Sequence, residues 1–206
     1  MRVIGYIGED MMIIGLTGGI ASGKSTVSKA LKEMGLPIFD ADEVSRQAVS
    51  KGSQGLKLVV EAFGEDYLTG TGEMNRPKIA ELVFKNKEAL HTLEGIIHKV
   101  VWQEAESFLA ENQDQKAVVL DVPLLIECGW HKKVDQVWLV AVDPETQIVR
   151  AMARSGMTRA EVVARIKAQM SLQEKMNYAD FVIDNSGELE QTLASVRAKV
   201  KILLGE

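Results

Sequence analysis

The chain has 206 residues, of which 46% are hydrophobic and 26% are charged, and its formal net charge is −5. Such a chain can bury a core without disulfides, and its acidic balance excludes general nucleic-acid binding, which requires a basic surface. A single cysteine, Cys128, excludes an internal disulfide, and no apolar run is long enough to cross a bilayer. We therefore expect a cytoplasmic protein, monomeric or a small homo-oligomer, without a membrane or nucleic-acid partner.

The start of the chain predicts an N-terminal extension followed by strand, helix and strand. Residues 1–11 lack the apolar core and the cleavage site of a signal peptide, and we expect them to form the extension. The apolar run 12–16 ends in glycines and predicts a buried strand, and residues 25–34 have helical spacing up to Gly35. A second, short strand is expected at 37–40.

The interval 41–115 is too long for a single crossover connection and contains no clear strand. Asn75, followed by Arg76 and Pro77, is typical of a helix start, and the apolar residues between positions 90 and 108 follow helical spacing. We expect a helical insertion at the edge of the sheet.

A polar interval, residues 150–171, contains two helix-start signals, one near its middle and one at its end. Thr158 with Glu161, and Ser171 with Glu174, each match a capping box, in which two side chains reciprocally bind backbone N–H groups. Helices should therefore begin immediately after Thr158 and after Ser171, with a bend between Arg150 and Thr158.

The C-terminal helix is expected at about 188–204, with Ser186 as its cap and Gly205 at its end. Three more apolar strands are expected, at 117–122, 134–142 and 181–184. Continuous apolar strands separated by helices indicate an α/β fold with a parallel sheet covered on both faces.

A glycine-rich loop between the first strand and the first helix carries the strongest functional signal. Its sequence fits the phosphate-loop pattern G-x-x-x-x-G-K-[ST], in which glycines let backbone N–H groups turn toward an anion at a helix N-terminus. Lys24 can reach the β and γ phosphates of a nucleoside triphosphate, and the Ser25 hydroxyl can bind Mg²⁺. The loop consists of Gly18, Gly19, Ile20, Ala21, Ser22, Gly23, Lys24 and Ser25.

Such a loop occurs in kinases, GTPases and ATPase motors. The guanine-reading string Asn-Lys-x-Asp is missing, because the nearest string, residues 86–89, ends in Ala89. A motor usually needs a longer chain. A small-molecule kinase is the remaining interpretation.

Carboxylates at two strand ends and two arginines each allow a functional and a structural interpretation. Asp40 and Asp42 lie at the end of the second strand, where α/β sheets bind ligands, and one of these carboxylates either orients an acceptor hydroxyl or, as Asp42, caps the helix 43–49. Asp121 ends the third strand and either holds Mg²⁺ through water or is an ordinary polar strand end. Arg150 and Arg154, one helical turn apart, either stabilise the transferred phosphoryl group from a lid or form a solvated face.

Several ordered motifs resemble the dephospho-CoA kinase family over nearly the whole chain from Met12 onward. Together they are far more specific than the phosphate loop alone. They are residues 14–26 (IGLTGGIASGKST), 40–42 (DAD) with Arg46, 72–76 (GEMNR), 123–127 (PLLIE) and 179–185 (ADFVIDN).

The resemblance implies a P-loop kinase, a three-layer α/β sandwich whose five-stranded parallel sheet has the order 2-3-1-4-5. It implies one kinase domain, 12–206, that transfers the ATP γ-phosphate to the ribose 3′-hydroxyl of dephospho-coenzyme A, the last step of coenzyme A synthesis. The implied parts are a core (12–41, 116–149 and 172–206), a helical acceptor-binding insertion (42–115) and a lid (150–171).

The resemblance also implies roles for single residues. Asp42 would be the base or orienter of the acceptor hydroxyl, and Lys24, Arg150 and Arg154 would contact phosphate. The residues implied in nucleotide binding also include Thr26 and Asn185, and those implied in acceptor binding are Asp42, Arg46, Arg76, His98 and Leu124. The family usually has His-Pro where this chain has His98-Lys99, so we expect an unbroken helix there.

Overall fold

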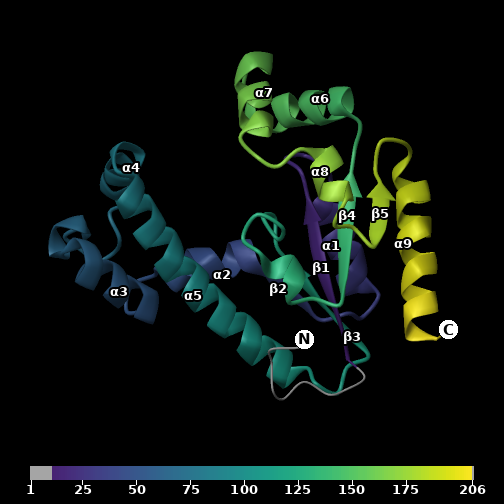
Figure 1. Cartoon of the computed structure of the whole chain (residues 1–206), viewed down its shortest axis with the longest axis horizontal. Coiled ribbons are helices and arrows are strands. Elements are labelled where there is room, and N and C mark those ends of the chain that lie inside the picture. The colour runs from purple at the N-terminus through teal and green to yellow at the C-terminus, as the bar shows by residue number, and fades with distance from the viewer. Residues whose placement is uncertain (1–10, 206) are drawn as a thin grey trace. The chain divides into compact units, whose positions relative to one another are not determined.

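The computed structural model describes residues 11–205 and divides the chain into two compact units (Figure 1). One unit, called here the sheet unit, comprises the chain up to Phe39 and from Leu109 onward, and the other, the helical unit, comprises Asp40–Phe108. The predicted extension lies outside the described residues except for Met11, which is buried. No helix between residues 11 and 205 combines the length and the apolar character needed to cross a membrane.

The sheet unit is built on five strands in the order β2-β3-β1-β4-β5, which confirms the predicted parallel sheet and its order. Strand β1 pairs in parallel with β3 and β4, and β4 pairs in parallel with β5. The strands are β1 (Met12–Gly18), β2 (Ile38–Asp40), β3 (Ala117–Asp121), β4 (Gln136–Ala141) and β5 (Phe181–Asp184). The register places Leu16 of β1 opposite Asp121 of β3, so the phosphate loop and Asp121 leave the sheet at the same edge.

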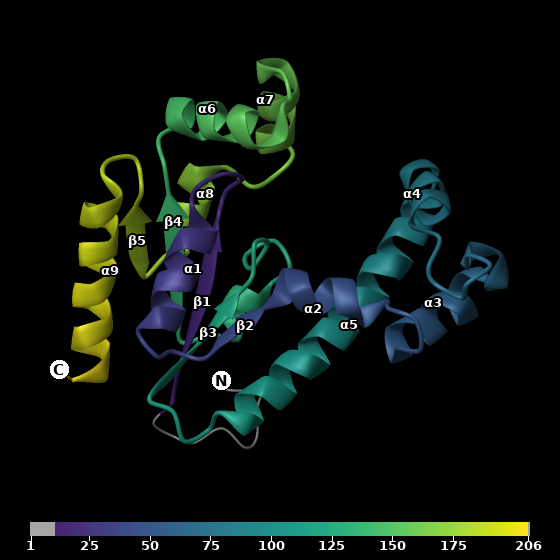
Figure 2. The ribbon, with the colours of Figure 1, turned by 180° about the vertical axis from the view of Figure 1, so that it is seen from behind.

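Helices cover both faces of this sheet. Helices α1 and α9 pack against each other on one face, and α8 lies on the opposite face against β4 (Figures 1 and 2). The chain leaves β4 into α6 and α7, which contact each other, before it returns through α8 to β5. The bounds are α1 (Lys24–Glu33), the short 3₁₀ helix η2 (Trp130–Lys132), α6 (Pro144–Ser155), α7 (Arg159–Lys167), α8 (Leu172–Met176) and α9 (Leu189–Leu204).

The core of the sheet unit lies between the strands and the α1/α9 layer. Trp138 of β4 is completely buried there and meets Phe181 of β5 edge to face, with 5.1 Å between the ring centres. Aliphatic side chains fill the rest of this layer and include Ile14, Leu16, Val27, Leu31, Val119 and Val196. This packing fixes the strand ends on which the phosphate loop stands.

Both predicted capping boxes are present. The Thr158 hydroxyl accepts from the Glu161 N–H, and the Glu161 carboxylate accepts from the Thr158 N–H. Ser171 and Glu174 repeat the arrangement at the start of α8. These bonds hold the pKa values of both glutamates below their usual range, because hydroxyl and backbone donors stabilise the ionised carboxylates.

The predicted cap of the C-terminal helix is wrong. The residue before α9 is Glu188, which makes no side-chain cap bond, and the Ser186 hydroxyl instead accepts from the backbone N–H of Asp143 at 3.0 Å. The Ser186 hydroxyl, which the local sequence pattern assigned to the start of α9, is therefore hydrogen-bonded to a residue distant in the sequence instead. The predicted end is confirmed, because Gly205 adopts φ 74° as the helix terminates.

The helical unit contains α2 (Ala41–Ala48), α3 (Gln54–Phe63), the 3₁₀ turn η1 (Glu65–Tyr67), α4 (Arg76–Lys85) and the long α5 (Lys87–Glu111). Asn75 caps α4 by accepting from the Lys78 N–H, as its position before Arg76-Pro77 predicts. Helix α5 continues through Lys99, which confirms that the helix is unbroken without the proline. The unit has its own core, made by Val49, Val59, Ile79 and Leu93.

Candidate active site

The phosphate loop joins β1 to α1 in a backbone shape suited to an anion. Gly23, the residue before α1, has φ 91°, and Ala21 adopts the left-handed φ of 55° that residues other than glycine seldom use. The Ser22 N–H turns back to the Gly19 carbonyl at 3.1 Å. Helix α1 then begins at Lys24, so the first free N–H groups and the positive end of the helix dipole lie at the loop.

Lys24 and Asp121 are brought together by the register of β1 and β3. The ammonium of Lys24 donates to Oδ1 of Asp121, and the Asp121 carboxylate is almost completely buried. The pair places one cation and one carboxylate at the carboxyl edge of the sheet, where α/β proteins bind their ligands. Ser25 and Thr26 follow in the first turn of α1 and are exposed.

Asn185, which follows β5, holds the loop from the side. Its amide Nδ2 donates to the Ser22 carbonyl at 2.8 Å. A Cβ on Gly23 would lie 2.0 Å from that nitrogen, so a side chain at this position is incompatible with the bond. Asn185 therefore touches the loop itself, which supports its implied place at the nucleotide.

The two arginines of the predicted lid lie in different surroundings. Nη1 of Arg150 donates to the backbone carbonyl of Asn185 at 2.8 Å, whereas Arg154 is exposed one turn later on α6. Arg150 is thereby fixed beside the loop, and Arg154 points its charge toward solvent.

A salt bridge joins the two helices of this region. Arg159 at the start of α7 donates to both carboxylate oxygens of Glu145 on α6, at 3.0 and 2.5 Å. Hydrogen bonding to the guanidinium lowers the pKa of Glu145, so the pair stays ionised in neutral solution. The two charges are exposed and screened, and they orient the helices more than they stabilise the fold.

The helical unit brings three of the implied acceptor-binding residues together. Asp42 lies exposed in the first turn of α2, and its backbone carbonyl accepts from Nε of Arg46 at 3.0 Å. Nη2 of Arg76 in turn reaches the Arg46 carbonyl at 3.4 Å. The cap of α2 is Asp40, whose carboxylate accepts from the Glu43 N–H, so the alternative role of Asp42 as the helix cap is wrong. His98 is exposed on α5.

The loop after β3 carries a buried ion pair that the sequence did not indicate. Leu124 is partly exposed on this loop, and three residues later Glu127 places Oε1 2.9 Å from Nζ of Lys175 on α8. The geometry is that of an ion pair without a well-aligned hydrogen bond, since the ammonium is buried and makes no such bond within the described part of the chain. The pair ties α8 to the loop that begins at Asp121.

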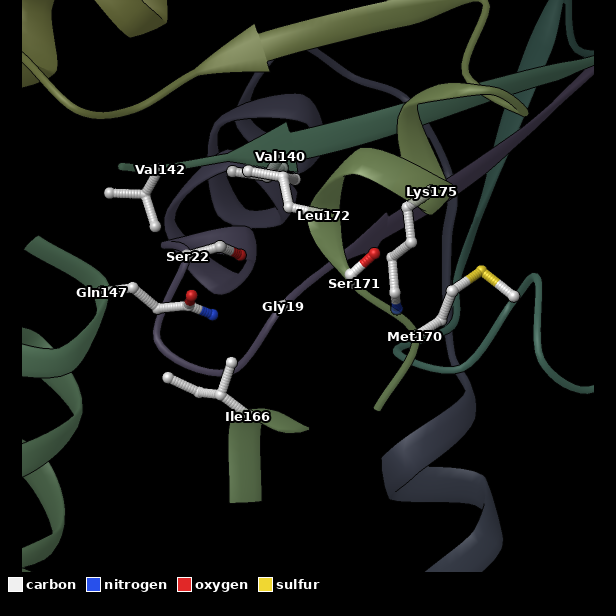
Figure 3. Close-up of a pocket in the computed structure, with 10 residues that line it drawn as sticks. All are labelled: Gly19, Ser22, Val140, Val142, Gln147, Ile166, Met170, Ser171, Leu172 and Lys175. Atoms are coloured by element: carbon white, nitrogen blue, oxygen red, sulfur yellow. The ribbon is translucent and has the colours of Figure 1, made fainter. Parts of the chain in front are cut away.

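A pocket lies between the phosphate loop, the end of β4 and α8 (Figure 3). Its wall is apolar where β4 and α7 contribute, and its polar groups come from Ser22, Gln147, Ser171 and Lys175. The Ser22 hydroxyl is buried and makes no hydrogen bond among residues 11–205. The pocket therefore extends the phosphate loop with polar groups from α6 and from α8 with its cap.

Sequence reasoning missed Gln147, Glu127 and Lys175. Gln147 lies one helical turn before Arg150, so the shared helix face was a usable signal. No local signal marked Glu127 or Lys175. The two residues are 48 positions apart, so their ion pair does not follow the i, i+4 spacing by which a helical ion pair can be recognised in a sequence.

Comparison with known proteins identifies relatives over almost the whole chain. A family model described as dephospho-CoA kinase matches residues 12–191. A dephospho-CoA kinase of Carboxydothermus hydrogenoformans is 46% identical over 182 residues, which cover 87% of this chain and 88% of the relative. The crystal structure of TT1252 from Thermus thermophilus matches with a TM-score of 0.81 at 35% identity, over 95% of this chain and 99% of that one. A dephospho-CoA kinase structure from Campylobacter jejuni matches with a TM-score of 0.71 at 25% identity, over 95% and 98% of the two chains.

Proposed function

The chain belongs to the dephospho-CoA kinase family, and we propose that it transfers the γ-phosphate of ATP to the ribose 3′-hydroxyl of dephospho-coenzyme A, giving coenzyme A and ADP. The observation that carries this proposal is the phosphate loop with Lys24 and Asp121 joined at its edge, in a chain that matches the family from residue 12 to residue 191. Phosphoryl transfer needs positioning and charge stabilisation more than covalent chemistry, and this site offers both.

The phosphate loop binds the triphosphate. Backbone N–H groups of the loop face the phosphates, except those of Ser22 and Thr26, which donate to carbonyls within the loop, and Asn185 keeps the Ser22 carbonyl turned away from the phosphates. The Lys24 ammonium is the charge that meets the β and γ phosphates. Its present partner, Asp121, keeps the ammonium at the mouth of the loop.

Ser25 and Asp121 have the chemistry of a magnesium site. A hydroxyl in the first turn after the loop and a carboxylate at the next strand end are hard oxygen ligands of the kind that Mg²⁺ prefers, and Mg²⁺ usually has few protein ligands beside the phosphates. When bound, the ion would neutralise negative charge on the phosphates. Asp121 would hold it through water, and Ser25 directly.

The acceptor is bound by the helical unit. Asp42 accepts or orients the proton of the attacking hydroxyl, and its exposed carboxylate at the start of α2 supports this role. Arg46 and Arg76, which are linked through the Arg46 carbonyl, supply positive charge for the acceptor phosphates, and His98 is the remaining acceptor residue of this unit. The resemblance to the family adds Leu124, which belongs to the sheet unit.

The lid, residues 150–171, stabilises the transferred group. Arg150 is already anchored at Asn185 beside the loop, and Arg154 on the same helix is exposed and available. Guanidinium groups stabilise the charge that spreads over the phosphoryl oxygens, and a closed lid excludes water and so suppresses ATP hydrolysis.

An acceptor panel tests the proposal. The full chain is incubated with ATP, Mg²⁺ and one acceptor at a time (dephospho-coenzyme A, AMP, CMP or shikimate), and ADP release is measured. Release should require dephospho-coenzyme A, and Lys24→Ala should lower turnover at least about a hundredfold, or about 2.7 kcal/mol. Preference for AMP or CMP would reassign the substrate, and ATP binding without turnover on any acceptor would indicate a non-catalytic nucleotide-binding module.

A further inference from the structure

The phosphate loop is held by two side-chain amides, of which only Asn185 belongs to the expected site. The second is Gln147 in the first turn of α6, whose Nε2 donates to the Ile20 carbonyl at 2.8 Å across 127 positions of sequence. Figure 3 shows the Gln147 side chain reaching toward the loop beside Ser22. The two amides thus take the carbonyls on either side of Ala21.

Ala21 is the residue whose conformation most needs such support. Its φ of 55° is left-handed, and the surrounding structure must hold a residue with a Cβ in that region. The bond to the Ile20 carbonyl fixes the peptide plane before Ala21, and the bond from the Ser22 N–H to the Gly19 carbonyl fixes the plane after it. The bond from Asn185 to the Ser22 carbonyl then fixes the next plane, between Ser22 and Gly23. When the Ile20 and Ser22 carbonyls point outward, the N–H groups on the opposite side of the same two peptide planes, those of Ala21 and Gly23, can face the anion.

Gly19 fits closely against the same amide. A Cβ on Gly19 would lie 2.7 Å from Nε2 of Gln147, so the glycine leaves the space that the glutamine occupies. Gly23 stands in the same relation to Asn185, with 2.0 Å between a Cβ and the amide nitrogen. The two glycines and the two amides form two matched pairs around the loop.

The loop is also packed against the lid. Ile20 and Ala21 join an apolar cluster whose buried members are Ile148 and Ala151 of α6 and Val162 of α7. Gln147 precedes Ile148 on α6, so the hydrogen bond and the apolar contact come from the same helix. The lid helix and the loop are therefore joined by both polar and apolar contacts.

We propose that Gln147 is a positioning residue for the nucleotide, which holds the phosphate loop in its anion-binding shape before ATP arrives. The loop is then ordered when the chain folds, and the free energy of ordering it does not reduce the free energy of nucleotide binding. Gln147 should therefore lower the Kd for the nucleotide. Once ATP is bound, its phosphates order the loop themselves, and the rate of phosphoryl transfer depends little on Gln147. This inference rests on the proposed nucleotide site.

The test compares Gln147→Met, which keeps length and removes the donor without adding charge, with Gln113→Met in the exposed turn before β3. Gln147→Met should raise the Kd for ADP and the KM for ATP about tenfold, with the KM for the acceptor and kcat at saturating ATP within about twofold of the wild type. Circular dichroism verifies that each variant is folded. A loss confined to thermal stability, or an equal rise of both KM values, would overturn the positioning role. Failure of the wild-type chain to bind ADP would instead overturn the proposed nucleotide site.

A second comparison uses the close approach at Gly19. In the wild-type background, Gly19→Ala must displace the Gln147 amide and should weaken ADP binding about tenfold. In a Gln147→Ala background the space is free, and Gly19→Ala should cost less than about threefold. Equal costs in the two backgrounds would show that Gln147 and the loop are energetically independent, and would refute the proposal.

Discussion

The ion pair between Glu127 and Lys175 predicts an unusual asymmetry in stability. Lys175 is 1% exposed, whereas the Glu127 side chain is 23% exposed. Glu127→Gln leaves an ammonium in the interior without a counter-charge, and breaking a buried pair in this way costs about 3–5 kcal/mol. Lys175→Met keeps the buried hydrocarbon stem and leaves a carboxylate that can turn toward water, so we expect only about 1 kcal/mol.

Urea unfolding followed by tryptophan fluorescence measures these costs, because Trp130 and Trp138 are buried in the sheet unit. In a chain of this length Glu127→Gln should lower Tm by about 6–20 °C and Lys175→Met by about 2–4 °C. The control is Lys201→Met, exposed on α9, which should change little. Adding Lys175→Met to Glu127→Gln should restore stability, since no buried charge then remains. A double variant less stable than Glu127→Gln alone would refute the reasoning.

Two further predictions concern the site, and a third concerns the cysteine thiol. Asp42→Asn keeps the shape and removes the charge, so it should preserve ATP and acceptor binding while lowering kcat by about 10²–10⁴, measured by steady-state kinetics; full activity would remove the proton-accepting role. Arg150→Ala and Arg154→Ala should each lower kcat more than they raise the Kd for ATP, because the guanidinium groups meet charge that develops during transfer; wild-type kinetics in both would make them a solvated face. Burial raises the pKa of the Cys128 thiol, so a maleimide should label it more slowly than free cysteine at pH 7.5. A labelling rate equal to that of free cysteine would contradict the raised pKa. Because the pKa of the thiol is higher in the folded chain, its contribution to the free energy of unfolding is complete below the unfolded pKa of about 8.5 and is lost as pH rises through the folded pKa.

The parts of the fold that the sequence predicted are those decided by local chemistry. The capping boxes at Thr158 and Ser171 need only four consecutive residues each, and the cap at Asn75 likewise binds within its own turn. The strand at Phe181–Asp184 was predicted with its observed bounds, because an apolar run between polar residues suffices to define it. Such signals persist whatever the tertiary arrangement.

The bend predicted between Arg150 and Thr158 is wrong in its first part, because α6 continues to Ser155. The other errors occurred where a distant partner competes with a local one. Ser186 was predicted as a helix cap, but its hydroxyl accepts from the N–H of Asp143 on a neighbouring segment. Asp42 was given a cap as its alternative role, and Asp40 at the preceding strand end takes that position. In both segments, several polar side chains that could accept the hydrogen bond of a helix cap lie close together in the sequence. Which of them caps the helix depends on the tertiary structure.

The candidate site divides in the same way. The phosphate loop and the nearness of Asp121 to it followed from a motif and from strand order. The contact of Gln147 with the loop did not, because its hydrogen bond joins α6 to a carbonyl 127 positions earlier in the sequence. No periodicity or spacing encodes such a contact.

The position of the new phosphate tests the central claim most directly. Product made from ATP and dephospho-coenzyme A by the full chain is purified and examined by phosphorus NMR, with correlation to the ribose protons. The account predicts one new phosphate monoester, coupled to the ribose H3′, in amounts equal to the ADP released. A phosphate at another position, or ADP released without a phosphorylated acceptor, would contradict it.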